Sequence, residues 1–298
     1  MIPPRRIVLS GGGIKVTALV GALNSLEKQG YLKKVQEVCG VSAGAFLGFL
    51  VTTGLPLKQI ESLVLDLDFS IIRNLTPEAF IEFPERFGID DAKQFVRFLE
   101  SIFRVVLKLD PAITFSEFTN LQKPGQLRFR CWATDLNTLG IREFSNEKTP
   151  SIKIIDALRA SMALPLYFTP FIDPINGHML TDGGVQGNLP LHHLTESECE
   201  DSLSIGFSSG EVKQVGPEDL LSFVNSIFSC LIHSRNQDCL KKWDHRILKI
   251  SVDTYPSWNF EASREDRSML LKMGYESARK WLKNPSCGSR KIERRYSL

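Results

Sequence analysis

Residues 35–44, Val-Gln-Glu-Val-Cys-Gly-Val-Ser-Ala-Gly, decide the fold of this chain. Residues 35–39 are predicted to form a short buried strand, and residues 40–44 a tight turn. The small and apolar residues that follow, as far as about Thr53, favour a helix that ends at Gly54. This order of strand, turn and helix is the repeating unit of a parallel sheet covered by helices.

A unit of the same kind precedes this one in the sequence. Residues 7–9 form a short apolar run, and the glycine-rich turn Ser10-Gly-Gly-Gly13 follows it. From Ile14 onward, apolar residues recur at helical spacing until Gly30, which can end a helix. Two successive units predict an α/β fold whose central sheet is mainly parallel. The length of 298 residues fits one such domain, which we place at residues 1–283.

The rest of the chain alternates between helical and extended segments. Residues 57–122 are rich in phenylalanine and lack the strand pattern, so we expect a helical cap inserted into the sheet domain. Residues 284–298 form a basic tail that is predicted to be disordered. The other predicted elements are strands at 127–133, 141–144 and 203–207, a helix from Thr149-Pro150 to about 163, a hairpin folded at Asn176-Gly177, and a C-terminal helix–strand–helix at 217–283.

Composition excludes several classes of protein. The chain is 43% hydrophobic and 23% charged with a formal net charge of +2, so it lacks the cationic excess typical of a nucleic-acid-binding protein. Its six cysteines are scattered, which is typical of reduced thiols in the cytoplasm. The apolar runs are too short for a signal peptide or a membrane span. We therefore expect a cytoplasmic protein that could contact a membrane only peripherally.

The turn Gly40-Val-Ser-Ala-Gly44 matches the G-x-S-x-G pattern of a nucleophile elbow. In such an elbow the serine occupies a strained turn with its Oγ projecting, and glycines at the flanking positions avoid collisions across the turn. The N-terminus of the following helix favours negative charge near that oxygen. Because the pattern is short, its place between a predicted strand and a predicted helix is what supports Ser42 as a nucleophile.

The triplet Gly11-Gly12-Gly13 ends the preceding strand and opens a helix, so its backbone N–H groups could bind a phosphate or an oxyanion. The dinucleotide pattern G-x-G-x-x-G requires a glycine where this chain has Val16, and Lys15 does not satisfy the Walker pattern. A glycine triplet alone is more often simply a tight turn. Beside an elbow on the neighbouring strand, we interpret it as an oxyanion-binding loop.

A base for the serine is expected in Asp182-Gly183-Gly184, which begins 140 positions after Ser42. The glycines allow the aspartate to sit on an exposed, permissive turn, although an isolated Asp-Gly-Gly is more often only a turn. Three glycine-marked turns in one chain favour the catalytic interpretation. No cluster of His, Cys, Asp or Glu has the spacing of a metal site, so neither a metal nor another cofactor is expected.

In these motifs the chain resembles the patatin-like phospholipases. The oxyanion loop of that family, G-G-G-x-[RK]-G, corresponds to Gly11 through Lys15, with Val16 in place of the last glycine. The elbow and the Asp-Gly-Gly turn follow in family order, and the resemblance covers about residues 5–205. Weaker similarities are Ala133-Thr-Asp-Leu136, Ala160-Ser-Met-Ala-Leu-Pro165 and Asn188-Leu-Pro190.

The resemblance implies a three-layer α/β/α fold with a Ser–Asp dyad that needs no histidine and no metal. Ser42 would be the nucleophile and Asp182 the base, while Lys15 would support the loop or add positive potential. The oxyanion would be bound by Gly11, Gly12 and Gly13. The implied activity is that of a lipid acyl hydrolase of the phospholipase A or lysophospholipase type, acting on phospholipids or other acyl lipids. Head group, acyl position and oligomeric state do not follow from the sequence.

Two other functions remain open. An α/β-hydrolase esterase would use a Ser–His–Asp triad, but that fold builds several strands before its serine, and only one strand–helix unit precedes Ser42. A binding module without activity would have no physical need of both Ser42 and Asp182.

A histidine base would have to be His178, His192, His193, His233 or His245. With a carboxylate base, we expect a pH–rate profile without an essential ionisation near the ordinary histidine pKa of about 6.5.

Residues 91–108 are predicted to form an amphipathic helix. Such a helix, like the basic tail, could lie on an anionic membrane, and its binding would then fall with salt. The commoner arrangement is a cap helix whose apolar stripe packs on the core and whose basic face is solvated. The stripe comprises Phe95, Phe98, Leu99, Ile102, Phe103 and Val106, and the basic residues are Lys93, Arg97, Arg104 and Lys108.

Overall fold

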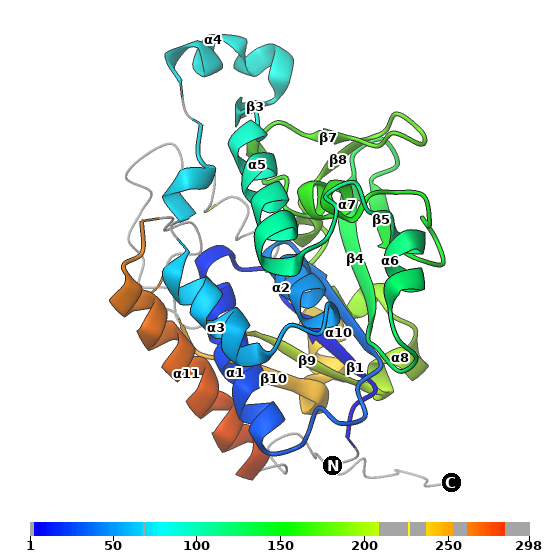
Figure 1. Cartoon of the computed structure of the whole chain (residues 1–298), viewed down its shortest axis with the longest axis vertical. Helices are drawn as coiled ribbons and strands as arrows, with labels where there is room; N and C mark the ends of the chain where they lie inside the picture. Colours follow the sequence, from blue (N-terminus) through cyan, green and yellow to red (C-terminus); the bar gives the residue numbers. More distant parts are fainter. Residues whose placement is uncertain are drawn as a thin grey trace, which may run out of the picture.

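An eight-stranded sheet forms the centre of the molecule (Figure 1). The structure is a computed structural model that describes residues 3–67, 69–74, 76–208, 226, 237–252, 255 and 261–283. The strand order is β10-β9-β1-β2-β4-β8-β7, with β5 paired to β4. The strands are β1 (Arg6–Leu9), β2 (Glu37–Val41), β4 (Arg128–Asp135), β5 (Gly140–Ser145), β7 (Phe171–Ile172), β8 (Met179–Thr181), β9 (Ser202–Phe207) and β10 (Ile247–Ile250).

The sheet is mainly parallel, as the two strand–turn–helix units predicted. Strands β10, β9, β1, β2 and β4 all run in the same direction. Strands β5 and β8 run antiparallel to β4, and β7 runs antiparallel to β8. Leu9 pairs with Gly40 and Val41 with Trp132, so β1, β2 and β4 end close together. We call this end of the sheet the carboxyl edge.

Helices cover both faces of the sheet and complete three layers. Alternate residues of β1 divide between them: Ile7 and Leu9 belong to the main core, whereas Val8 faces a smaller cluster with Trp243. The main core includes residues of α1 (Val16–Lys28), α2 (Ala43–Thr52), α3 (Leu57–Asp66), α7 (Ile154–Ser161) and α11 (Arg264–Lys283). The smaller clusters are closed by η5 (Pro190–His193), α8 (Glu196–Glu200) and α10 (Gln237–Lys242). The chain therefore has the three-layer α/β/α fold that the resemblance implied.

The segment 57–122 is largely helical, but it is not purely so. It contains α3, η2 (Phe69–Ile72), α4 (Pro77–Arg86), α5 (Lys93–Ser101), a π-helical turn η3 (Ile102–Leu107) and α6 (Phe115–Leu121). It also contains the short strand β3 (Gly88–Asp90), which pairs in parallel with β6 (Leu166–Phe168) in a separate two-stranded sheet. Figure 1 shows α3 beside α1 and α11, whereas α4 stands away from the sheet. A separate cap domain stays a prediction.

The amphipathic stripe of residues 91–108 packs inward. Phe95, Leu99 and Phe103 are fully buried in the main core, and Phe98 and Val106 pack against it. Arg104 is exposed and forms an ion pair with Glu100 in the same segment. The apolar stripe of this segment therefore packs on the protein itself, as in the commoner of the two predicted arrangements.

Helix α7 and the C-terminal part of the chain differ from their predicted bounds or lie partly outside the described residues. Helix α7 begins at Ile154 rather than at Thr149-Pro150, because the Thr149 hydroxyl instead bonds the backbone of Ser145 and closes the turn after β5. Most of the helix predicted from residue 217 and the tail 284–298 lie outside the described residues. Among those described, no helix is both long enough and apolar enough to span a membrane.

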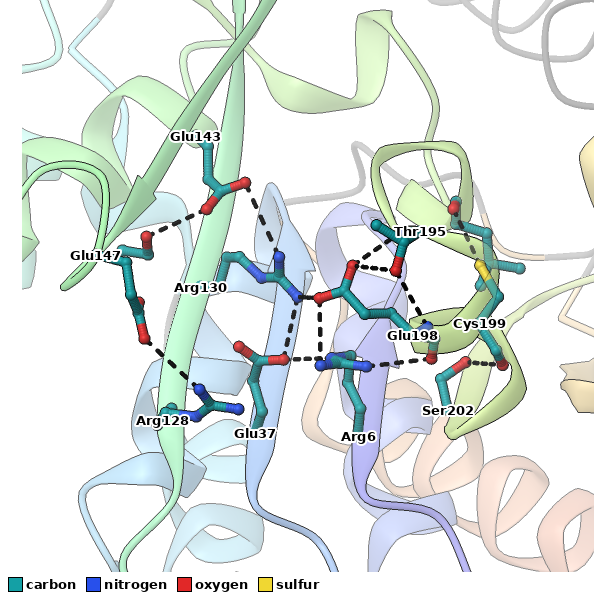
Figure 2. Close-up of polar contacts among 12 residues, drawn as sticks. Arg6, Glu37, Arg128, Arg130, Glu143, Glu147, Thr195, Glu198, Cys199 and Ser202 are labelled. Atoms are coloured by element: carbon teal, nitrogen blue, oxygen red, sulfur yellow. Dashed lines mark hydrogen bonds and ion pairs between the residues drawn. The ribbon is translucent and has the colours of Figure 1, made fainter.

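A network of charged side chains joins the sheet to α8, toward the amino ends of the strands (Figure 2). Arg6 on β1 pairs with Glu37 on β2. Arg130 on β4 donates to Glu37 at 3.1 Å and to Glu198 on α8 at 2.7 Å. Removing one partner of a buried ion pair would leave the other charge buried and unpaired, which is costly. The network therefore holds α8 against the end of the sheet opposite the carboxyl edge.

Candidate active site

Ser42 lies in a strained turn between β2 and α2. Its backbone has φ 53° and ψ −134°, a conformation that a non-glycine residue rarely adopts. The glycines on either side make the turn possible: a Cβ on Gly40 would lie 2.5 Å from the carbonyl oxygen of Gly44, and one on Gly44 would lie 2.4 Å from that of Ser10. These contacts are those expected of a nucleophile elbow, with the serine at the carboxyl edge.

Ser161 on α7 holds the backbone of the elbow. The amide of Ser42 donates to Ser161 Oγ at 3.0 Å, and that hydroxyl donates to the carbonyl oxygen of Trp132 at 2.7 Å. Ser161 and Trp132 are fully buried. One side chain therefore links the elbow to the neighbouring strand β4 and helps to maintain the unfavourable φ of Ser42.

Asp182 follows β8 and is held on both sides of its backbone. Its amide donates to the Ala163 carbonyl at 2.8 Å, and its carbonyl accepts from Thr134 Oγ1 at 2.9 Å. Oδ1 accepts from the amide of Gly184 at 2.7 Å. The side chain is buried, unlike the exposed turn that the glycines suggested. The carboxyl group is consequently fixed before any ligand arrives.

Burial raises the pKa of Asp182 to about 6, while hydrogen bonding with the Ser42 side chain and the Gly184 amide acts in the opposite direction. Its second oxygen, Oδ2, is buried without a partner in full hydrogen-bond geometry among the described residues. Loss of hydration penalises the ionised form of a carboxyl group and makes it a stronger base. A carboxylate in this environment is suited to accept a proton from a nearby hydroxyl.

The two glycines after Asp182 are required by close packing. A Cβ on Gly183 would lie 2.3 Å from the carbonyl oxygen of Trp132, and one on Gly184 would lie 2.9 Å from Asp182 Oδ1. A side chain at either position would displace β4 or the carboxyl group itself. The Asp-Gly-Gly turn thus has a local steric reason, whatever its chemical role.

The three amides of the glycine loop differ in their hydrogen bonds. The N–H of Gly11 donates to the carbonyl of Asn188 at 2.9 Å, and Asn188 Nδ2 donates back to the Gly11 carbonyl at 2.9 Å. The Gly11 amide is therefore already engaged within the protein, and the oxyanion role of all three amides stays a prediction. Hydrogen bonds among the described residues leave the amides of Gly12 and Gly13 unused.

The glycine loop lies between the elbow and the ring of Phe207. A Cβ on Gly11 would lie 3.0 Å from Ser42 Cβ, so the loop passes directly beside the elbow. At Gly12 a Cβ would lie 2.5 Å from the ring of Phe207. Lys15 Nζ lies 5.8 Å from the centre of that ring, and Val16 is buried at the start of α1. Lys15 thus lies at the same edge of the sheet, and its supporting role there stays a prediction.

Sequence reasoning missed the positions of Ser161 and Asn188. Ser161 holds the elbow. Asn188 lies between the glycine loop and the Asp-Gly-Gly turn, because its Oδ1 would contact a Cβ added to Gly11 or to Gly184. Both residues lie in segments that had been noted only as family similarities, 160–165 and 188–190. The signal was present in the sequence, but the contacts they make are visible only in three dimensions.

Three of the described histidines, His178, His193 and His245, lie beside an acidic or an aromatic side chain. His178 pairs with Asp135 at 2.7 Å. The His193 ring lies 5.4 Å from that of Trp132 and 3.8 Å from that of His192, and burial lowers the His193 pKa to about 3. His245 lies beside Trp243, with ring centres 6.0 Å apart. His233 lies outside the described residues.

A metal ion in a protein is bound by a cluster of suitable side chains. Nowhere in the described part of the chain do three His, Cys, Asp or Glu side chains gather as they would around a metal ion. The groups that the described residues place at the site are a hydroxyl, a buried carboxyl group and backbone amides.

Comparison with known proteins places this geometry in a wider context. The family model described as patatin-like phospholipase matches residues 7–195. The "Probable lipid hydrolase 463L" of Invertebrate iridescent virus 6 is 27% identical over 187 residues, which cover 63% of this chain and 62% of the viral protein. Patatin-like phospholipase domain-containing protein 7 of Rattus norvegicus is 28% identical over 197 residues, which cover 62% of this chain and 12% of the rat protein.

One solved structure covers more of the chain. VipD from Legionella pneumophila superposes with a TM-score of 0.63 over 95% of this chain and 67% of that protein, at 16% identity. At that identity the similarity establishes the fold alone. The family model, at residues 7–195, covers the part of the chain that contains Ser42 and Asp182.

Proposed function

This chain belongs to the patatin-like phospholipase family, and we propose that it is a lipid acyl hydrolase of the phospholipase A or lysophospholipase type. Its substrates would be phospholipids or other acyl lipids, as the names of its relatives suggest for those proteins. Ser42 would act as the nucleophile and Asp182 as its base, without a metal or another cofactor.

In the first half-reaction, Ser42 Oγ attacks the ester carbonyl carbon and its proton passes to Asp182. The carbonyl oxygen becomes an oxyanion, which the amides of Gly12 and Gly13 would bind. When the intermediate collapses, the bond to the alcohol breaks, and Asp182 returns the proton to the departing oxygen. The acyl group is then bonded to Ser42.

Water completes the reaction in the second half. Asp182 takes a proton from a water molecule that attacks the acyl carbon, and the same oxyanion position is used again. Collapse breaks the bond to Ser42 Oγ, which recovers the proton from Asp182, and the fatty acid is released. No step requires another titrating side chain.

A single observation supports this proposal best. The buried carboxyl group of Asp182 interacts with the hydroxyl of Ser42, and Ser42 has the strained backbone of an elbow. Asp182 Oδ2 is buried without a hydrogen bond of full geometry, which is costly in a purely structural residue and calls for a functional explanation.

Hydrolysis of a fluorogenic ester tests the proposal. The wild-type protein should hydrolyse it, Ser42→Ala and Asp182→Asn should lose nearly all activity, and Ser145→Ala should serve as a matched control for loss of a hydroxyl. All variants should melt cooperatively, which separates loss of chemistry from loss of fold.

The alternatives predict different results. In a Ser–His–Asp esterase, one of the five His→Ala variants would match the loss at Ser42 while Asp182→Asn stayed active. In a binding module, the wild-type protein would hydrolyse no ester, although it could still bind lipid. Either outcome would replace the dyad.

A further inference from the structure

The turns around Asp182 expose aliphatic side chains to solvent at the carboxyl edge. Leu139 is 78% exposed, and four neighbours are between 41% and 57% exposed. We call these five residues the apolar rim: Leu136, Leu139, Ile141, Ile172 and Ile175. Isolated exposed aliphatic residues are normal on a protein surface, so their grouping next to the site is the relevant observation.

Hydrogen bonds and strand pairing connect the segments that carry three of the rim residues, Leu136, Leu139 and Ile172. The amide of Leu136, just beyond β4, donates to the carbonyl of Met179 on β8 at 3.0 Å. Met179 pairs directly with Ile172 on β7, so their side chains lie on the same face of that hairpin. Gln186, four positions after Asp182, donates to the carbonyl of Leu139 at 3.1 Å. Figure 1 shows β7 and β8 together at the carboxyl end of β4.

Leu139 occupies a position that folding alone would give to a different residue. Its φ is 55°, in the left-handed region where glycine or asparagine costs less than a branched side chain. A leucine there makes the turn less favourable and also leaves an apolar side chain in water. Backbone strain of this kind is concentrated at functional positions.

The rim also lacks exposed charge. Residues 136–141 and 174–177 contain no Asp, Glu, Lys or Arg. Asp173 is fully buried and pairs with Arg142 at 2.7 Å, and His178 pairs with Asp135. Such a surface has nothing to attract an anionic surface and no charge to desolvate when it enters an apolar phase. Its complement is an uncharged, apolar medium.

We propose that the apolar rim inserts into the surface of a lipid bilayer and places the Ser42 site against the ester bonds of its lipids. This inference rests on the proposed function, because the substrate of a lipid acyl hydrolase lies in such a surface. The rim depends on hydrophobic insertion, so it favours neutral, zwitterionic lipid and is insensitive to salt. In this it differs from the electrostatic docking that the sequence left open for the segment 91–108.

Flotation with phosphatidylcholine vesicles tests the proposal. The double variant Leu139→Ser/Ile175→Ser should bind the vesicles at least about tenfold more weakly than wild type, because burial of one large aliphatic side chain alone accounts for about tenfold in affinity. Leu121→Ser is the matched control. Leu121 is 67% exposed, and Gln122 beside it bonds the Leu127 carbonyl at the amino end of β4, away from the rim. This control should bind as wild type does, in low and in high salt.

Activity separates this inference from the proposed function. The double variant should lose at least about tenfold more activity on the vesicles than on a soluble short-chain ester. If the wild type hydrolyses neither substrate, the proposed function is wrong. If it hydrolyses both and the variant is not selectively impaired on vesicles, or if binding requires anionic lipid and falls with salt, the rim does not insert. A change of oligomeric state in the variant would instead identify the rim as a contact between copies of the chain and would overturn the proposal.

Discussion

Replacing Asp182 with Asn should stabilise the protein at high pH while abolishing its activity. Burial raises the pKa of this carboxyl group from 3.8 to about 6, so the folded state holds its proton more tightly than the unfolded state does. Below both values the group is protonated in both states and carries no penalty. As the pH rises from 3.8 through about 6, stability is lost.

The size of the effect follows from the same pKa. At about 1.36 kcal/mol for each pKa unit, the ionised carboxylate costs the folded state about 3 kcal/mol once the pH is well above 6. Asparagine has nearly the same shape, keeps the bond from the Gly184 amide through Oδ1, and does not ionise. Comparing two pH values removes any constant effect of the new amide group, so only the ionisation term remains.

Urea unfolding of wild type and Asp182→Asn, at about pH 4 and about pH 8, measures this term. The variant should gain about 2–3 kcal/mol relative to wild type between the two pH values. Asp66→Asn, which changes an exposed carboxyl group on α3, should show almost no such gain. An equal difference at both pH values would mean that the Asp182 carboxyl group is not desolvated, and the reasoning about its basicity would be wrong.

Three further outcomes are expected. Ser161→Ala should lower the free energy of unfolding by about 1–3 kcal/mol and should also lower kcat, since it leaves the Ser42 amide unpaired. The control Thr149→Val removes another buried bridging hydroxyl and should affect stability alone. Equal losses of kcat in the two variants would contradict a positioning role for Ser161. Gly12→Val should reduce kcat about 10²–10³-fold, because its side chain would collide with Phe207 and disturb an oxyanion amide, whereas a steady-state effect confined to KM would argue against that role. Hydrolysis should continue in excess EDTA and EGTA, and its restoration by calcium after loss would reveal a metal site.

The elements that are coded locally could be predicted from the sequence. The strand, elbow and helix around Ser42 were predictable because glycine spacing and apolar runs act over a few residues. Strand β3 could not be found in this way, because three residues show no alternation and its partner β6 lies far along the chain. Thr149 looked like a helix cap, but its hydroxyl found a nearer partner in Ser145.

That the candidate residues would lie close together could be predicted from the sequence, whereas their electrostatics could not. Glycine-marked turns pointed to Ser42 and Asp182, yet the use of the Gly11 amide depends on Asn188, which is distant in sequence. The sequence also led us to expect no essential ionisation near pH 6.5. Burial of Asp182 brings its pKa to about 6, so activity should rise with pH through that region even without a histidine.

Covalent labelling tests the central claim most directly. A fluorophosphonate ester is attacked by an activated serine, which forms an oxygen–phosphorus bond and releases fluoride. Intact-mass and peptide analysis should find one adduct, on Ser42, whose rate of formation rises through about pH 6 and collapses in Asp182→Asn. A protein that stays unlabelled, an adduct on another serine, or full labelling of Ser42 in Asp182→Asn would contradict the assignment of Ser42 and Asp182 as nucleophile and base.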